Sequence, residues 1–194
     1  MQSFDFSSVK ALIFDLDGTL ADTMPLHLEA CNLVCNELGF DFPEDYFYQE
    51  AGKPTLEVFR NLMIHLNLPY NGDELGKKKE VKVLEIMHKV KFVPVVHQIF
   101  QQYKNTHAFA IGSGGQKHTV LLTLQYLGLS EADFGAVVTC DDVEHHKPHP
   151  ETFLKAAQIL GVEPKDCVVL EDGDPGIKAA IDAGMQYIDI RKLL

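Results

Sequence analysis

Short apolar runs alternate with amphipathic stretches over the second half of the chain, and this alternation constrains the fold most. The runs at residues 107–111, 136–139, 167–170 and 187–190 have the length and composition of buried strands. Between them, apolar residues recur at helical spacing. Strands that alternate with helices form parallel sheets covered on both faces. We therefore predict an α/β fold with a Rossmann-like parallel sheet.

One further strand is predicted near the start of the chain, at residues 9–14. From about residue 22 to 92, helical patterns follow one another with no strand pattern between them. Because the first strand belongs to the same sheet as the later ones, the helical block is an insert after it. We predict a core domain made of residues 1–21 and 94–194, and a helical cap domain over 22–93.

Two carboxylates, Asp15 and Asp17, follow the first predicted strand. Strand side chains alternate with a period of two, so both begin on the same side of the chain, and Gly18 then permits a sharp turn. Two like charges this close repel each other. A divalent cation such as Mg²⁺ would relieve the repulsion, or one carboxylate could attack a substrate while the other carries protons. The alternative is a pair of ordinary loop aspartates at a strand end.

Two further groups follow later strands. Ser113, Gly114 and Gly115 precede a predicted helix, where free backbone N–H groups suit a phosphate oxygen, although such a sequence is also ordinary loop chemistry. Lys147 comes after the strand at 136–139, and beside a phosphate it would neutralise charge that opposes attack. Its alternative role is that of a solvated surface charge.

A second acidic pair, Glu171 and Asp172, directly follows the strand at 167–170. The same cation would resolve its repulsion. The alternative is helix capping ahead of Pro175, for which Asp174 is the better placed residue. In open parallel sheets, ligands bind at the carboxyl ends of the strands, where all of these groups are expected. Together they provide a nucleophile, a proton carrier, a phosphate cradle, a lysine and metal ligands, which predicts phosphoryl transfer through an aspartyl-phosphate.

The net charge of −11 argues against a partner nucleic acid or an anionic membrane, because both favour a basic surface. The lysine run at 77–79 is predicted to lie on the solvated face of a helix over 73–91. We expect no signal peptide, no spanning segment and a cytoplasmic protein. Its four cysteines are expected to be reduced and to act as small buried apolar residues.

The chain resembles the haloacid dehalogenase superfamily in four motifs that occur in the family's order. They are Asp15-Leu16-Asp17-Gly18-Thr19, Ser113, Lys147-Pro148 and Glu171-Asp172. Asp22-Thr23, His27 and the helical insert resemble the β-phosphoglucomutase-like branch. The stretches 52–55 and 143–148 are similar to bacterial sugar phosphatases of that branch, including those that act on fructose 1-phosphate.

The resemblance implies a Mg²⁺-dependent phosphatase for a small phosphorylated metabolite, acting as a monomer or weak homo-oligomer. It implies the following residues: catalytic Asp15, Asp17, Ser113 and Lys147; substrate-binding Gly114, His27 and Lys53; metal-binding Asp15, Asp17 through its carbonyl, Asp172 and Glu171. Mutases of this branch hold a second phosphate with an arginine of the insert, and residues 51–55 contain none. The missing arginine favours a phosphatase. A sugar phosphate mutase is the alternative, and a phosphorylatable receiver-like module is a further one.

Overall fold

The computed structural model describes residues 6–50 and 55–194. The chain divides into two compact units. One, here called the core unit, contains residues 1–22 and 90–194, and the other, the inserted unit, contains residues 23–89. None of the helices in the described part of the chain combines the length and the apolar character needed to cross a membrane.

The core unit is built on a five-stranded sheet in the order β3-β2-β1-β4-β5. The strands are β1 (Ala11–Phe14), β2 (Ala108–Gly112), β3 (Ala136–Val138), β4 (Cys167–Glu171) and β5 (Gln186–Asp189). Every neighbouring pair is parallel. Phe14 at the end of β1 is in register with Ile111 of β2 and Leu170 of β4. The residue that follows β1 is therefore at the centre of the carboxyl edge of the sheet.

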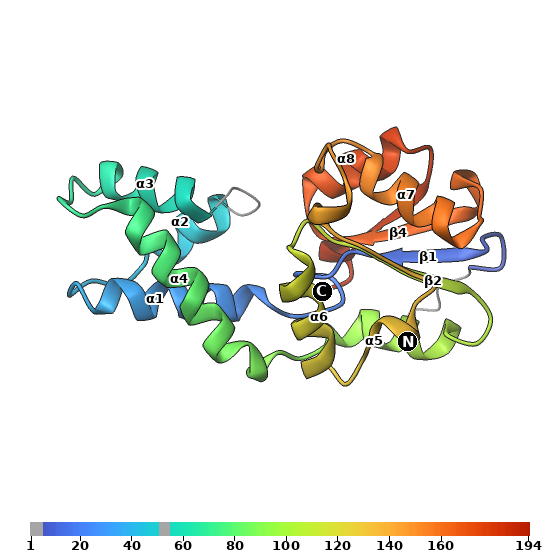
Figure 1. The fold of residues 1–194 in the computed structure, drawn as a ribbon, viewed down its shortest axis with the longest axis horizontal. Coiled ribbons are helices and arrows are strands. Elements are labelled where there is room, and N and C mark those ends of the chain that lie inside the picture. The colour runs from blue at the N-terminus through green and yellow to red at the C-terminus, as the bar shows by residue number, and fades with distance from the viewer. Residues whose placement is uncertain (1–5, 51–54) are drawn as a thin grey trace. The chain divides into compact units, whose positions relative to one another are not determined.

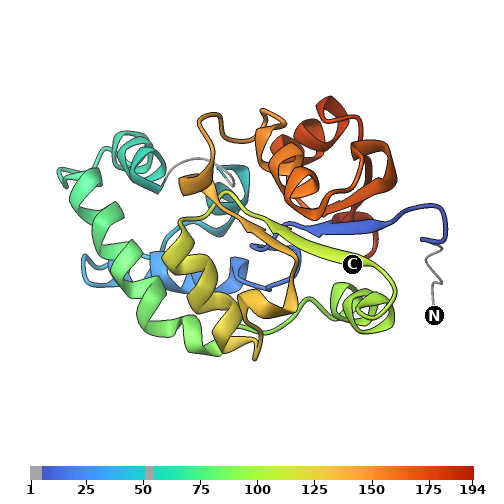
Figure 2. The same cartoon turned by 45° about the vertical axis from the view of Figure 1, so that its right-hand side comes forward.

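Helices cover both faces of this sheet, with α7 and α8 on one face and α5 and α6 on the other (Figure 1; Figure 2). These helices are α5 (Pro94–Tyr103), α6 (Lys117–Tyr126), α7 (Glu151–Leu160) and α8 (Asp174–Asp182), and the short 3₁₀ turns are η2 (Glu131–Asp133), η3 (Cys140–Asp142), η4 (Pro164–Asp166) and η5 (Ile190–Lys192). Successive β1 side chains lie on opposite faces of the sheet. Ile13 belongs to the cluster that contains Phe153 of α7, whereas Phe14 packs against Phe100 of α5. The predicted α/β fold with a helical insert after its first strand is confirmed.

The inserted unit is helical, and no strand occurs among its described residues. Its elements are α1 (Met24–Asn36), α2 (Glu44–Gln49), α3 (Thr55–His65), α4 (Gly72–Ile86) and the 3₁₀ turn η1 (Met87–Lys89). Phe42 anchors the core of the unit, with its ring centroid 5.4 Å from that of Phe59. The predicted helix over 73–91 is too long, because α4 ends at Ile86 and the chain tightens into η1.

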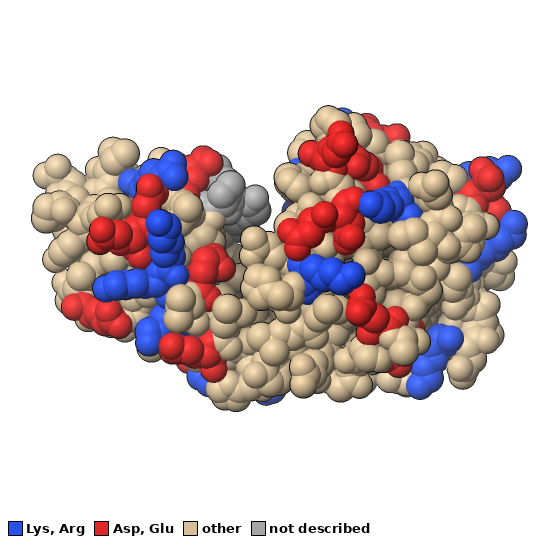
Figure 3. Space-filling view, viewed as in Figure 1, with Lys and Arg blue, Asp and Glu red and all other residues tan. Residues whose placement is uncertain are grey.

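The lysine run on α4 is not one solvated face. Lys77 and Lys78 are exposed, but Lys79 is only 3% exposed. Lys79 follows Leu75 by four residues and precedes Val83 by four, so it lies on the buried stripe of the helix. The prediction of a solvated lysine is therefore wrong at this position. Elsewhere on the visible surface of the inserted unit, basic and acidic side chains alternate (Figure 3).

Three of the four cysteines are buried as predicted, and Cys140 is the exception with intermediate exposure. Burial raises the pKa of Cys31 to about 11, that of Cys35 to about 12 and that of Cys167 to about 11. These three thiols stay protonated at neutral pH and act as small apolar side chains.

Candidate active site

Asp15 lies directly after β1 and is 7% exposed. Its backbone N–H donates to the carbonyl of Leu170 at 3.0 Å, which continues the pairing of β1 with β4 by one residue. The chain then turns sharply at Gly18, which has a φ of +82° that favours glycine. The N–H of Gly18 donates to the carbonyl of Ala21 at 2.8 Å. This turn fixes the direction in which Asp15 leaves the sheet.

Lys147 joins the two acidic groups that the sequence places far apart. Its Nζ donates to Asp15 Oδ1 at 2.6 Å and to Glu171 Oε1 at 2.8 Å. The ammonium also lies 4.6 Å from the centre of the Phe153 ring. Burial alone lowers the pKa of Lys147, but the two carboxylates outweigh it and the pKa lies above its usual value. Lys147 is therefore a buried cation, and its alternative role as a solvated surface charge is excluded.

The Glu171 side chain is held by the start of α8. Its Oε2 accepts a hydrogen bond from the N–H of Gly173 at 2.5 Å. A Cβ on Gly176 would lie 1.7 Å from Glu171 Oε1, so only glycine leaves room for this carboxylate. The prediction that Asp174 caps the helix is wrong, because Gly173 occupies the N-cap position and Asp174 pairs with Arg191 at 2.7 Å. Glu171 itself supplies the acceptor at this helix end.

Asp172 is positioned by the turn after β1. Its Oδ1 accepts a hydrogen bond from the Thr19 hydroxyl at 2.7 Å, and its Oδ2 would lie 2.3 Å from a Cβ on Gly18. Thr19 is fully buried. The motif at 15–19 contains Thr19, but sequence reasoning gave it no role. The signal that could have indicated a role is a threonine hydroxyl that directly follows the turn glycine Gly18.

Asp15, Glu171 and Asp172 each offer a carboxylate oxygen within 4.8 Å of the other two. Burial raises the pKa of Asp15 well above its usual value, against the effect of Lys147, and the two neighbouring acids add to the rise. Burial and Glu171 likewise raise the pKa of Asp172. A bound cation would relieve this repulsion, and an all-oxygen donor set fits a hard divalent ion. The three acids together could therefore bind a metal.

Ser113 lies at the end of β2, next to the β1 group. It is 1% exposed, and its hydroxyl oxygen accepts a hydrogen bond from the N–H of Gly115 at 2.9 Å. A Cβ on Gly115 would lie 3.2 Å from Ser113 Oγ and 3.6 Å from Asp17 Oδ2. Asp17 and Ser113 therefore flank the same glycine. Gly114 is exposed, with open space where a side chain would begin.

The first turn of α6 has a competing acceptor. The N–H of Lys117 donates to Asp141 Oδ2 at 2.8 Å, so one of the free donors predicted at this helix start already has a partner. Ser113 and the exposed backbone of Gly114 are suited to a phosphate oxygen.

Glu151, at the first position of α7, organises the loop that carries Lys147. Its two oxygens accept hydrogen bonds from the N–H groups of Glu144 at 2.9 Å and His145 at 3.0 Å. The amide of Glu144 and the side chain of His145 lower the pKa of Glu151 to about 2, so it stays ionised. Sequence reasoning missed this residue because its partners are backbone groups of a loop.

The predicted substrate residues outside the core unit are His27 and Lys53. His27 lies on α1, where its Nδ1 is 2.7 Å from the Nζ of Lys79. Lys53 is outside the described residues. The structure therefore brings together Asp15, Asp17, Ser113, Gly114, Lys147, Glu171 and Asp172 at the carboxyl edge of the sheet, and places His27 in the inserted unit.

Comparison with known proteins agrees with this arrangement. The family model described as haloacid dehalogenase-like hydrolase matches residues 12–190. A fructose-1-phosphate phosphatase from Escherichia coli is 36% identical over 183 residues, which cover 94% of this chain and 96% of that protein. A phosphorylated carbohydrates phosphatase from Thermotoga maritima is 32% identical over 182 residues, covering 93% of this chain and 84% of that protein.

Among solved structures, a putative β-phosphoglucomutase from Thermotoga maritima superposes with a TM-score of 0.77 at 30% identity. The match covers 92% of this chain and 83% of that one. The family model and the relatives extend over both the sheet and the helical insert. The chain therefore belongs to the haloacid dehalogenase-like hydrolases, in their β-phosphoglucomutase-like branch, and is a phosphatase-type hydrolase of that family.

Proposed function

We propose that this protein is a Mg²⁺-dependent phosphatase that hydrolyses small phosphorylated sugars through an aspartyl-phosphate on Asp15. One observation carries the proposal: the buried Lys147 ammonium joins Asp15 to Glu171 at the carboxyl edge of the sheet. A buried carboxylate beside a fixed cation is suited to attack an anionic phosphate, because the cation offsets the charge that builds up during attack.

The proposed reaction has two steps. In the first, an oxygen of Asp15 bonds to phosphorus, the bond from phosphorus to the sugar oxygen breaks, and Asp17 gives that oxygen a proton. In the second, Asp17 takes a proton from water, the water oxygen attacks phosphorus, and the bond to Asp15 breaks. Phosphate leaves and both aspartates return to their starting states. Lys147, Ser113 and the backbone at Gly114 would hold the phosphate oxygens in both steps.

Mg²⁺ is the metal that the donor set fits best. Asp15, Asp172 and the backbone carbonyl of Asp17 would hold it, with Glu171 acting directly or through water. Mg²⁺ bound in this way would offset negative charge on the carboxylates and the phosphate. Chelation by EDTA should abolish turnover, and added Mg²⁺ should restore it. Full activity in EDTA would contradict this assignment.

The substrate is proposed from the relatives. One of them is a fructose-1-phosphate phosphatase and another a phosphorylated carbohydrates phosphatase, so fructose 1-phosphate is the first substrate to test. His27 and Lys53 of the insert are proposed to contribute to substrate selection. A panel of phosphorylated metabolites, assayed for phosphate release with Mg²⁺, should place fructose 1-phosphate or a close analogue at the highest kcat/KM.

The nucleophile is tested with Asp15→Asn, which keeps the shape of the side chain but removes its charge and its attacking oxygen. Activity should fall to background while circular dichroism stays that of the wild type. Substantial turnover in this variant would refute the role of Asp15.

In Asp17→Asn, the phosphoenzyme should accumulate with a good leaving group, and intact-mass measurement would detect it. Steady turnover of p-nitrophenyl phosphate by the wild type would exclude a receiver-like module.

The mutase alternative is favoured by one observation, the similarity to a putative β-phosphoglucomutase structure. It is tested with β-glucose 1-phosphate, Mg²⁺ and a trace of the 1,6-bisphosphate. A phosphatase releases free phosphate under these conditions. Rapid formation of glucose 6-phosphate with little free phosphate would overturn the proposal in favour of the mutase.

A further inference from the structure

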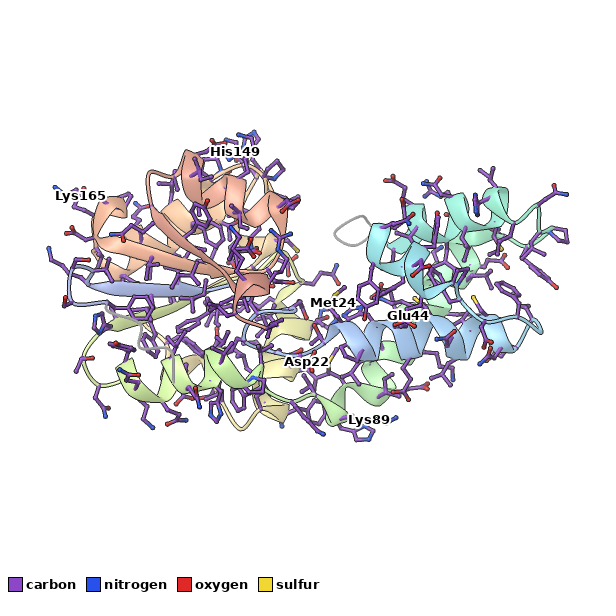
Figure 4. The ribbon with its side chains drawn as sticks, turned by 180° about the vertical axis from the view of Figure 1, so that it is seen from behind. Asp22, Met24, Glu44, Lys89, His149 and Lys165 are labelled. Atoms are coloured by element: carbon purple, nitrogen blue, oxygen red, sulfur yellow. The ribbon has the colours of Figure 1, made fainter. Side chains whose placement is uncertain are left out.

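A second group of metal-ligating side chains lies in the core unit, apart from the acidic cluster. His145, His149 and Glu151 each offer one ligand atom, and these atoms all lie within 4.8 Å of one another. His145 Nδ1 is 2.9 Å from Glu151 Oε2, and His149 Nδ1 is 3.9 Å from the same oxygen. Figure 4 shows His149 at the outer surface of the core unit.

The three side chains are open to solvent on one side. Their exposed fractions are 62% for His145, 49% for His149 and 29% for Glu151. The two imidazole rings lie 4.6 Å apart between centroids. An ion held here would have three protein ligands and would complete its coordination with water.

The chemistry of the donor set differs from that of the acidic cluster. Two imidazole nitrogens and one carboxylate oxygen suit Zn²⁺, Ni²⁺, Co²⁺ or Cu²⁺, whereas three carboxylates suit Mg²⁺. Imidazole binds such ions through a ring nitrogen, and it is the commonest metal ligand among the side chains. The two groups of ligands in the core unit should therefore bind different classes of ion.

Glu151 is already fixed in a position to act as a ligand. The N–H groups of Glu144 and His145 hold its two oxygens, so its carboxylate is ordered before any ion arrives. The contact from His145 Nδ1 to Oε2 is the one that an ion would replace, with both atoms then serving as ligands. Orienting contacts of this kind raise the affinity of a metal site.

We propose that His145, His149 and Glu151 form a site for a nitrogen-preferring divalent transition metal. Two of its ligands stand two residues on either side of Lys147, and the third begins α7. A bound ion would link both ends of the loop that holds Lys147. Binding should therefore stabilise the folded protein, by an amount that rises with the logarithm of the free metal concentration above the Kd. This inference does not depend on the phosphatase function.

The test is Zn²⁺ binding to the untagged full chain, measured by isothermal titration calorimetry with excess Mg²⁺ present to occupy the acidic cluster. The wild type should bind one equivalent of Zn²⁺ that His149→Ala loses or binds at least about tenfold more weakly. His146→Ala is the matched control, because His146 is exposed on the same loop but absent from the cluster. It should retain wild-type binding.

Two results would overturn the proposal. One is unchanged Zn²⁺ affinity in His149→Ala, and the other is an equal loss in His146→Ala, since either would place the ion elsewhere. A spectroscopic measurement gives an independent answer. The electron paramagnetic resonance spectrum of one equivalent of Cu²⁺ should show nitrogen splitting from two imidazoles in the wild type and fewer in His149→Ala. Identical spectra would also refute the site.

Discussion

Among the residues that the structure describes, each unit contains a lysine whose side chain is largely shielded from solvent, and these two lysines have different partners. The side chain of Lys147 in the core unit is 10% exposed and faces two carboxylates that are themselves buried. The side chain of Lys79 in the inserted unit is 4% exposed and faces an imidazole nitrogen, a hydroxyl and the carboxylate of Glu80, which is 52% exposed.

The difference shows that a buried lysine does not by itself indicate a reactive site. Around Lys147, three clustered acids exceed one ammonium, and the excess negative charge suits a metal ion. Around Lys79, the described residues place one partly exposed acid beside the ammonium, and an imidazole nitrogen and a hydroxyl complete its hydrogen bonds. We therefore propose a chemical role for Lys147 and a role for Lys79 in the stability of the helical insert.

The largest effect is expected for Lys147→Ala. The change removes the cation that offsets charge at Asp15, so kcat/KM should fall by about 10²–10³-fold. The matched control is Lys178→Ala, because Lys178 also pairs with an acid but has a 62% exposed side chain. Steady-state phosphate release measures both variants. A loss below tenfold for Lys147→Ala would remove the distinction between the two lysines.

Lys79→Met should act on stability. The variant removes the buried ammonium that contacts His27 Nδ1 and Glu80, and the free energy of unfolding should fall by about 1–3 kcal/mol. Lys78→Met is the control, because Lys78 is 57% exposed and lies 3.7 Å from its acidic partner. Urea denaturation compares the two. Equal midpoints would show that Lys79 contributes no more than a surface lysine.

Thr19→Val tests whether the position of Asp172 in the core unit matters for metal binding. It removes the hydroxyl that holds Asp172 at 2.7 Å but keeps the shape of the side chain. The Mg²⁺ concentration needed for half-maximal activity should rise about tenfold, and saturating Mg²⁺ should restore most of the rate. An unchanged Mg²⁺ requirement would mean that Asp172 needs no such support.

The smallest effect concerns pH and the insert. Burial raises the pKa of Glu80, but Lys79, Thr55 and His27 outweigh it, and the pKa lies below the ordinary 4.5. A lowered carboxyl pKa contributes stability above the unfolded pKa, and this stability is lost as the pH falls through the folded pKa. The contribution of the Lys79–Glu80 pair to the stability difference between wild type and Lys79→Met should thus shrink as the pH falls below 4.5. Denaturation midpoints from about pH 6 to about pH 3 would detect this. A difference that grows in acid would contradict the assignment.

Much of the core site was predictable because its residues directly follow strands. Asp15 and Glu171–Asp172 stand at ends of apolar runs, and in a parallel sheet those ends share one edge. The place of such residues along the chain therefore determines their place in the fold. Lys147 is further from its strand, and its contact with Asp15 depends on the loop that Glu151 holds.

Other features depend on contacts that a linear pattern does not contain. The room that Gly176 leaves for Glu171, and the bond from Thr19 to Asp172, each join elements that are distant in sequence. Lys79 is a different case. Its four-residue spacing from Leu75 and from Val83 indicates the buried stripe of a helix. Because two other lysines precede it directly, all three lysines were predicted to be exposed.

The chain leaves and re-enters the core unit through two paired segments. Ala21 bridges Phe92 in antiparallel fashion, the N–H of Asp22 donates to the carbonyl of Lys91 at 2.8 Å, and the N–H of Val93 donates to the carbonyl of Leu20 at 3.1 Å. The two ends are thus already closed like the base of a hairpin. An inserted segment of another length can replace residues 23–89 with little loss of stability in the core unit, because the entropy of loop closure changes slowly with loop length. The same sheet edge could in this way serve many different inserts.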